Sequence, residues 1–195
     1  MPEAAVAASA AICVAVLGAL LSYLYARRLE RRKSRPERLN AQLREFYGPL
    51  YAIFEATRIA HLRFVNTLRP GSTTLFAPDV PPLNIGELRL WRLWAMSTHQ
   101  HRSTPTDDVI INKAHLLIED EMPQCLLDFR AHKAGYDVVI ERWKQGDYTE
   151  HLSVVRHPGD AILDYLERSF IELKRKQAEE IDARKDGQAM SRSRT

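Results

Sequence analysis

Hydrophobic residues recur along the chain in steps of three and four, the spacing that places side chains on one face of an α-helix. The longest series begins at Leu39 and reaches Phe64, where a Pro-Gly pair soon stops it. Gly48 and Pro49 interrupt this series, and a proline inside a helix removes one backbone hydrogen bond. Because the apolar residues keep their phase across the interruption, we predict one long helix with a kink near Phe46.

The remainder of the chain has the same helical spacing, and no window alternates apolar and polar residues over the length of a β-strand. A stretch rich in proline, glycine, serine and threonine at 70–83 predicts a loop, and Gly146 ends the helix before it and predicts a second loop at 146–158. Ser103, Thr104 and Pro105 form a helix-start signal that should separate two helices. We therefore predict an all-α, antiparallel bundle of about five helices, with a long kinked first helix followed by helices at about 84–100, 103–118, 120–145 and 159–186.

The N-terminal pattern differs, because the 23 residues from Ala4 to Ala26 contain no charge. A helix of this length extends roughly 35 Å, enough to cross a hydrocarbon core of about 30 Å. Only Met1, Pro2 and Glu3 precede the run, so the positive start and small-residue cleavage site of a secretory signal are missing. We predict an uncleaved transmembrane anchor, so the lipid bilayer is the expected partner of this segment.

A cluster of basic residues follows this apolar run and gives residues 27–38 a net charge of +5. Positive flanks of membrane helices remain in the cytoplasm. The predicted organisation is an anchor at 1–26, a basic linker at 27–38, a cytoplasmic helical domain at 39–186 and a disordered tail at 187–195. The basic residues are Arg27, Arg28, Arg31, Arg32, Lys33, Arg35 and Arg38.

The net positive charge of the chain comes from the basic linker and not from the helical domain. The whole chain has a net charge of +3, and Glu3 is negative, so residues 39–195 carry a net charge of −1. The body therefore lacks the basic character of a nucleic-acid-binding protein, and we predict no nucleic-acid partner. Hydrophobic residues at 45% and charged residues at 27% are typical of a globular domain.

Small residues form one stripe along the apolar N-terminal run. Such a stripe allows two helices to approach closely in lipid, and an alanine-rich segment can also contain this pattern by chance. It leaves open a homodimer through Ala4, Ala8, Ala11, Ala15, Gly18 and Ser22.

Residues that could act in catalysis or bind a metal are scattered along the sequence. His115 and Glu119 lie four residues apart, a spacing that can place two metal ligands on one helix face. A third ligand, such as His132 or His151, would have to come from another part of the chain. No nucleophile elbow, phosphate loop or Cys-x-x-Cys motif is present in the sequence. We predict no catalytic residue, no metal and no cofactor, with His115, Glu119 and His132 as the only candidates for a site.

Three segments resemble a family of uncharacterised bacterial proteins with an N-terminal membrane anchor and a helical body. They are LNAQLREFYGPLYA at 39–52, EMPQCL at 121–126 and WKQGDY at 143–148. The resemblance implies a bacterial inner membrane location and a helical body, and it transfers no catalytic residue.

Together these features predict a single-pass inner-membrane protein with its N-terminus outside and its helical domain in the cytoplasm. We expect a non-enzymatic module that binds another protein or itself. The alternative is an enzyme, or a ligand or metal sensor, with its site around His115, Glu119 and His132.

Overall fold

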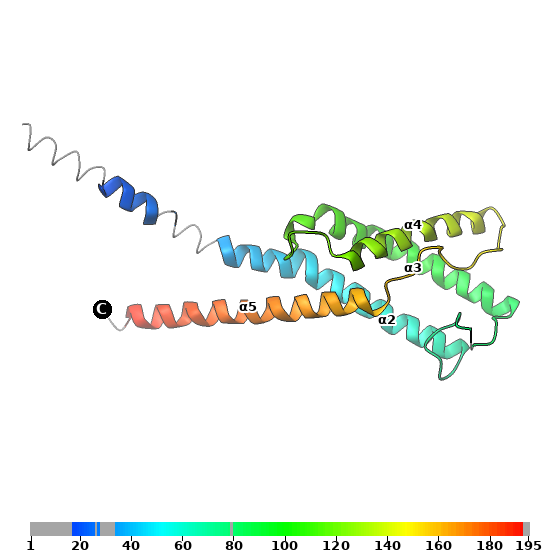
Figure 1. The fold of residues 1–195 in the computed structure, drawn as a ribbon. Coiled ribbons are helices and arrows are strands. Elements are labelled where there is room, and N and C mark those ends of the chain that lie inside the picture. Colours follow the sequence, from blue (N-terminus) through cyan, green and yellow to red (C-terminus); the bar gives the residue numbers. More distant parts are fainter. Residues whose placement is uncertain (1–16, 26, 28–33, 79, 193–195) are drawn as a thin grey trace, which may run out of the picture.

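The computed structural model describes residues 17–25, 27, 34–78 and 80–192. Within these residues every regular element is helical and no strand occurs, which confirms the predicted all-α class. Successive long helices run in opposite directions, as predicted for an antiparallel bundle (Figure 1). The elements are a helix at 34–41 that continues into the π-helix η1 (Gln42–Tyr47) and α2 (Gly48–Leu68), then α3 (Ile85–Asn112), the 3₁₀-helix η2 (Ala114–Leu116), α4 (Gln124–Lys144) and α5 (Asp160–Arg192).

The predicted interruption of the first helix takes the form of a π-helical turn. The N–H of Gly48 donates to the carbonyl of Leu43, five residues earlier, and the helix continues through Pro49 into α2. A π-turn widens the helix by one residue per turn. Glycine is required at position 48, since a Cβ there would lie 2.4 Å from the Leu43 oxygen. The helical run is continuous from residue 34 to Leu68, as predicted.

The predicted break at Ser103, Thr104 and Pro105 is wrong. A single helix, α3, runs through Pro105, so the described body has four long helices instead of five. Proline removes one helical hydrogen bond, but contacts with α4 hold the residues that follow it. Asp107 forms ion pairs with both Arg130 and Lys133 of α4.

Other helix boundaries shift by a few residues. α3 begins after Asn84, which forms a reciprocal capping box with Glu87. α4 begins at Gln124 instead of near Asp120, because residues 117–123 have no regular structure. The backbone of α5 continues to Arg192, into the segment 187–195 where we expected a tail.

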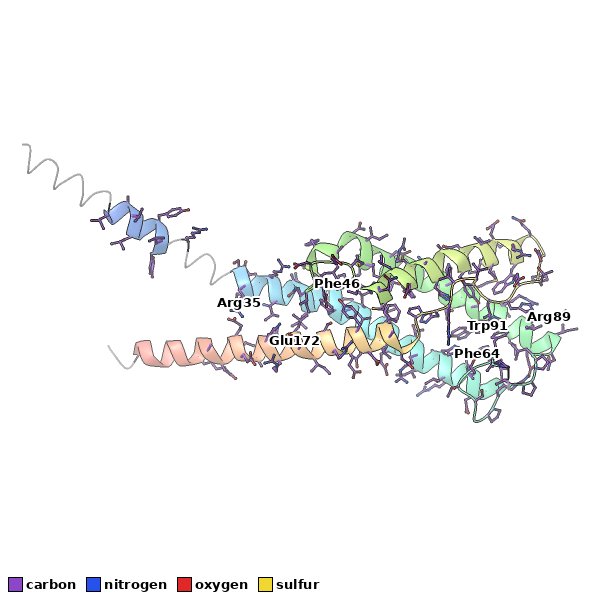
Figure 2. All side chains as sticks on the ribbon, in the orientation of Figure 1. Arg35, Phe46, Phe64, Arg89, Trp91 and Glu172 are labelled. Atoms are coloured by element: carbon purple, nitrogen blue, oxygen red, sulfur yellow. The ribbon has the colours of Figure 1, made fainter. Side chains whose placement is uncertain are left out.

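A first hydrophobic core joins the first helix, the end of α3, η2, α4 and α5. Phe46, Leu50 and Leu126 are fully buried there, and Phe54 stacks edge-on against Phe129 of α4. This core follows the predicted apolar series of the first helix as far as Leu50, as Phe46 illustrates in Figure 2. After the π-turn Phe54 is buried in place of the predicted Ile53, so the predicted phase is not kept across the interruption. Its buried members are Leu39, Leu43, Phe46, Tyr47, Leu50, Phe54, Ile110, Leu116, Leu117, Leu126, Ile162, Leu166 and Leu173.

A second core lies at the other end of the bundle and contains no α5 residue. Trp91 of α3 packs with Trp94 at 5.5 Å between ring centroids, and Phe64 of α2 stacks on Trp94 at 5.1 Å (Figure 2). The loop after α2 contributes Leu75, which is 3% exposed. The buried set is Val65, Leu75, Trp91, Ala95, Tyr136, Val139, Ile140 and Trp143.

The second half of α5 runs beside the start of the first helix. Glu180 forms an ion pair with Arg35 at 3.3 Å, and Gln177 donates to Asn40 at 2.7 Å. The C-terminal end of α5 and residue 34 therefore lie at the same end of the bundle (Figure 1).

Most of the predicted anchor lies outside the described residues. Of the run at 4–26, residues 17–25 are described, and they are helical and exposed. None of the described helices is long and apolar enough to cross a membrane. Gly18 and Ser22 of the small-residue stripe are exposed, whereas Ala4, Ala8, Ala11 and Ala15 lie outside the described part.

Candidate functional site

The segment between α3 and α4 is held against the first helix through its backbone. The side chain of Gln42 donates to the carbonyl of Leu116 at 3.0 Å, and the N–H of Ile118 donates to the Tyr47 hydroxyl at 3.0 Å. Both Gln42 and Tyr47 belong to the π-helical turn and are buried. The turn therefore positions two polar side chains that fix the path of residues 116–118.

Tyr47 also belongs to a network with Glu119 and Tyr165. The Tyr165 hydroxyl donates to Glu119 Oε2 at 2.9 Å, and the Tyr47 hydroxyl lies 3.3 Å from the same oxygen and 3.0 Å from the Tyr165 hydroxyl. Burial raises the pKa of Tyr47 to about 12, and burial together with the hydrogen bond that it shares with Tyr47 raises the pKa of Tyr165 further. Both phenols are therefore neutral at physiological pH and act as hydrogen-bonding groups, not as bases.

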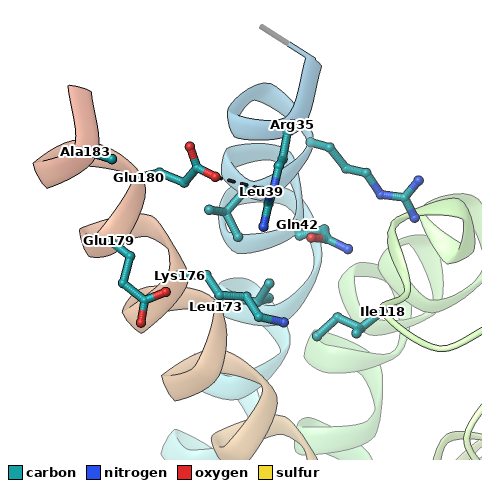
Figure 3. Close-up of a pocket in the computed structure, with 10 residues that line it drawn as sticks. Arg35, Leu39, Gln42, Ile118, Leu173, Lys176, Glu179, Glu180 and Ala183 are labelled. Carbon is teal, nitrogen blue, oxygen red and sulfur yellow. Dashed lines mark ion pairs between the residues drawn. The ribbon is translucent and has the colours of Figure 1, made fainter. Parts of the chain in front are cut away.

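A groove of about 470 Å³ lies beside this network, between the start of the first helix and the second half of α5 (Figure 3). Its floor is apolar, and charged side chains stand around it. Arg35 and Glu180 form an ion pair between the two helices at one end, and Lys176 extends from α5 into the groove (Figure 3). The lining residues are Arg35, Arg38, Leu39, Gln42, Ile118, Leu173, Lys176, Glu179, Glu180 and Ala183.

A second connecting segment, between α4 and α5, is also held through its backbone. The indole N–H of Trp91 and the hydroxyl of Tyr136 both donate to the carbonyl of His151, at 3.1 and 3.2 Å. The Nδ1 atom of His132 lies 2.6 Å from the carbonyl of Val155. Desolvation lowers the pKa of His132, and this outweighs the opposing effect of the Val155 carbonyl. The neutral ring therefore holds the loop.

The three candidate residues do not converge. His115 is exposed on η2, Glu119 interacts with the two tyrosines, and His132 contacts the loop before α5. Across the part of the chain that the structure describes, no group of three or more His, Cys, Asp or Glu side chains is placed to hold a metal ion. The enzyme or sensor alternative therefore has no supporting observation at His115, Glu119 and His132.

Of the predicted basic residues, the described ones are Arg27, Arg35 and Arg38, and all three are exposed. Arg35 and Arg38 line the groove. The side chains of Arg28, Arg31, Arg32 and Lys33 lie outside the described residues.

The network of Tyr47, Glu119 and Tyr165 could not be found from the sequence. Glu119 lies 72 residues from Tyr47 and 46 from Tyr165, so no local spacing connects them. A second feature could have been found. Four apolar residues follow steps of four, three and four along α4, on a face different from the buried one: Leu127, Ala131, Ala134 and Val138.

Comparisons of the chain with protein-family models, curated proteins and solved structures give no match.

Proposed function

We propose that the protein is a single-pass, membrane-anchored module that binds another helix through its cytoplasmic bundle and performs no catalysis. The anchor is the uncharged run from Ala4 to Ala26. The basic residues at 27–38 retain the bundle in the cytoplasm. The shared position of residue 34 and the C-terminal end of α5, at one end of the bundle, supports this arrangement because the opposite end then extends away from the anchor.

The observation that carries the proposal is the exposed apolar face of α4, which we call the α4 stripe: Leu127, Ala131, Ala134 and Val138. Leu127 is 46% exposed and Val138 is 62% exposed, and the two alanines between them are also exposed.

The spacing of the α4 stripe is that of a helix–helix seam. Steps of four and three match the contact positions of coiled coils, and the two small central residues allow another helix to approach closely. Full burial of a leucine or valine side chain contributes about 1.5–3 kcal/mol. Because Leu127 and Val138 are about half exposed, a docked helix gains about half of this value at each position, on a helix that already contributes its opposite face to the core.

The proposal is tested by photocrosslinking in cells that express the full chain. A photoreactive residue at Ala134 should give a defined crosslinked product, whose mass identifies either a second copy or a different protein. The same residue at Ala178, which is exposed on α5, is the matched control position. Val138→Lys should abolish the Ala134 product, whereas Ile171→Lys, at a 58% exposed position on α5, should leave it unchanged.

Absence of a product at Ala134, or equal products at Ala134 and Ala178, would contradict a role for the stripe. The membrane topology is tested separately by reporters fused after Thr195. A fluorescent protein should be active there and a periplasmic phosphatase inactive, and strong phosphatase activity would contradict a cytoplasmic bundle.

A further inference from the structure

The groove beside α5 combines an apolar floor with cationic side chains. Leu39 is 8% exposed and Leu173 is 2% exposed, so both form part of the packed floor, and Ile118 borders it from the segment before α4. Arg35 and Arg38 line it from the first helix, and Lys176 lines it from α5. This combination suits an amphiphile with an anionic head.

The ion pairs around the groove leave it with positive charge. Glu180 is neutralised by Arg35 at 3.3 Å, within the groove itself. The second acidic residue of the lining, Glu179, forms an ion pair at 2.5 Å with Arg175, which lies outside the lining.

Two cations remain. Lys176 pairs with Glu172 at 2.6 Å, but Glu172 lies one turn away along α5 and does not line the groove. Arg38 makes only a long contact of 3.5 Å with the carbonyl of Leu117, and among the described residues no carboxylate forms an ion pair with it. Arg38 is therefore the cation available to an anion, and Lys176 becomes available when the anion replaces Glu172 as its partner.

We propose that this groove binds the head group of an anionic phospholipid. Arg38 and Lys176 contact the phosphodiester, and the glycerol and first acyl carbons lie on Leu39 and Leu173. A guanidinium can donate two parallel hydrogen bonds to phosphate oxygens, which a lysine cannot. The inference rests on the proposed membrane anchor for its ligand, since the groove lies at the end of the bundle where the anchor joins.

The test titrates the purified full chain, in a neutral detergent, with phosphatidylglycerol and counts bound lipid by native mass spectrometry. Each basic residue near an anionic lipid surface contributes about 1 kcal/mol, so Arg38→Gln and Lys176→Gln should each raise the apparent Kd about fivefold. Arg44→Gln and Lys174→Gln remove the same charge from exposed positions on the same two helical runs, outside the groove. These control variants should change the Kd less than about twofold.

Three results would overturn the proposal. Equal weakening by the groove and control variants would mean that overall charge, not the groove, binds the lipid. Phosphatidylcholine that binds as tightly as phosphatidylglycerol would show that the groove does not recognise the anionic head group. Inorganic phosphate that displaces phosphatidylglycerol, and whose own binding is lost in Arg38→Gln, would make the free anion the ligand.

Failure of the anchor can be told apart from failure of the groove. Alkaline carbonate extraction of cell membranes reports whether the chain is an integral membrane protein. The lipid titration in detergent reports binding at the groove whether or not the anchor inserts.

Discussion

Replacement of Tyr47 by phenylalanine isolates the contribution of one buried hydroxyl to folding. Phenylalanine keeps the ring in the first core and removes only the oxygen, so the N–H of Ile118 loses its acceptor at 3.0 Å. A neutral hydrogen bond contributes about 1 kcal/mol, and an unpaired buried donor costs about 1–3 kcal/mol. The Ile118 N–H is only partly buried, and we therefore expect Tyr47→Phe to lower the free energy of unfolding by about 2 kcal/mol.

Tyr165→Phe provides the comparison, because it removes a hydroxyl from the same network. Its hydrogen bond to Glu119 is exposed to water, so the expected loss is about 1 kcal/mol or less. Both values come from urea unfolding of the full chain in detergent, followed by far-UV circular dichroism. If Tyr47→Phe lowers the free energy of unfolding no more than Tyr165→Phe does, the hydrogen bond from the Ile118 N–H does not stabilise the fold as we expect.

The same variant makes a prediction at alkaline pH. Burial raises the pKa of Tyr47 from 10.0 to about 12. Between these two values the unfolded chain loses a proton that the folded chain retains, so stability falls as the pH rises from 10 to 12. The stability of Tyr47→Phe should fall less over this interval, and an identical pH dependence in both proteins would refute the assignment.

Three further predictions concern the core, the π-helical turn and the loop at 146–159. Leu126→Ala, at a fully buried position, should lower the free energy of unfolding by about 2–5 kcal/mol, and the adjacent Leu127→Ala, at an exposed position, by much less in the same urea assay. Gly48→Ala should destabilise the protein by about 1–3 kcal/mol, although alanine normally stabilises a helix, because the new Cβ meets a carbonyl oxygen; a more stable variant would contradict the π-turn. Burial lowers the pKa of His132, so the loop should lose hydrogen-exchange protection as the pH falls below the ordinary histidine value of 6.5, and His132→Gln should remove that pH dependence.

The spacing of apolar residues predicted most of the fold. Steps of three and four correspond to the buried face of the first helix from Leu39 to Leu50, and both predicted loops lie between helices. This succeeds because burial of a helix face follows directly from periodicity. Beyond the π-turn the predicted phase is wrong, because the extra residue in the turn moves burial one position along, to Phe54 and Val65 in place of Ile53 and Phe64. The second apolar series of α4, from Leu127 to Val138, shows that one helix can carry two such faces, of which only one is buried.

Local signals failed where distant contacts decide the backbone. Pro105 predicted a helix start, yet Asp107 pairs with Arg130 and Lys133 of α4 and the helix continues. The predicted grouping of His115, Glu119 and His132 is wrong for a related reason. Glu119 is hydrogen-bonded to Tyr47 and Tyr165, which are distant from it in the sequence. The spacing of residues along the sequence does not indicate which distant side chains will form these ion pairs and hydrogen bonds.

Both connections that flank α4 are recognised through the main chain. Gln42 and Tyr47 contact backbone atoms of residues 116–118, while Trp91 and Tyr136 contact the carbonyl of His151. Every amino acid other than proline offers the same amide and carbonyl, so Ile118 and His151 can be replaced by other residues without loss of these particular hydrogen bonds. At these contacts the requirement for a particular side chain falls on the helices, at Gln42, Tyr47, Trp91 and Tyr136.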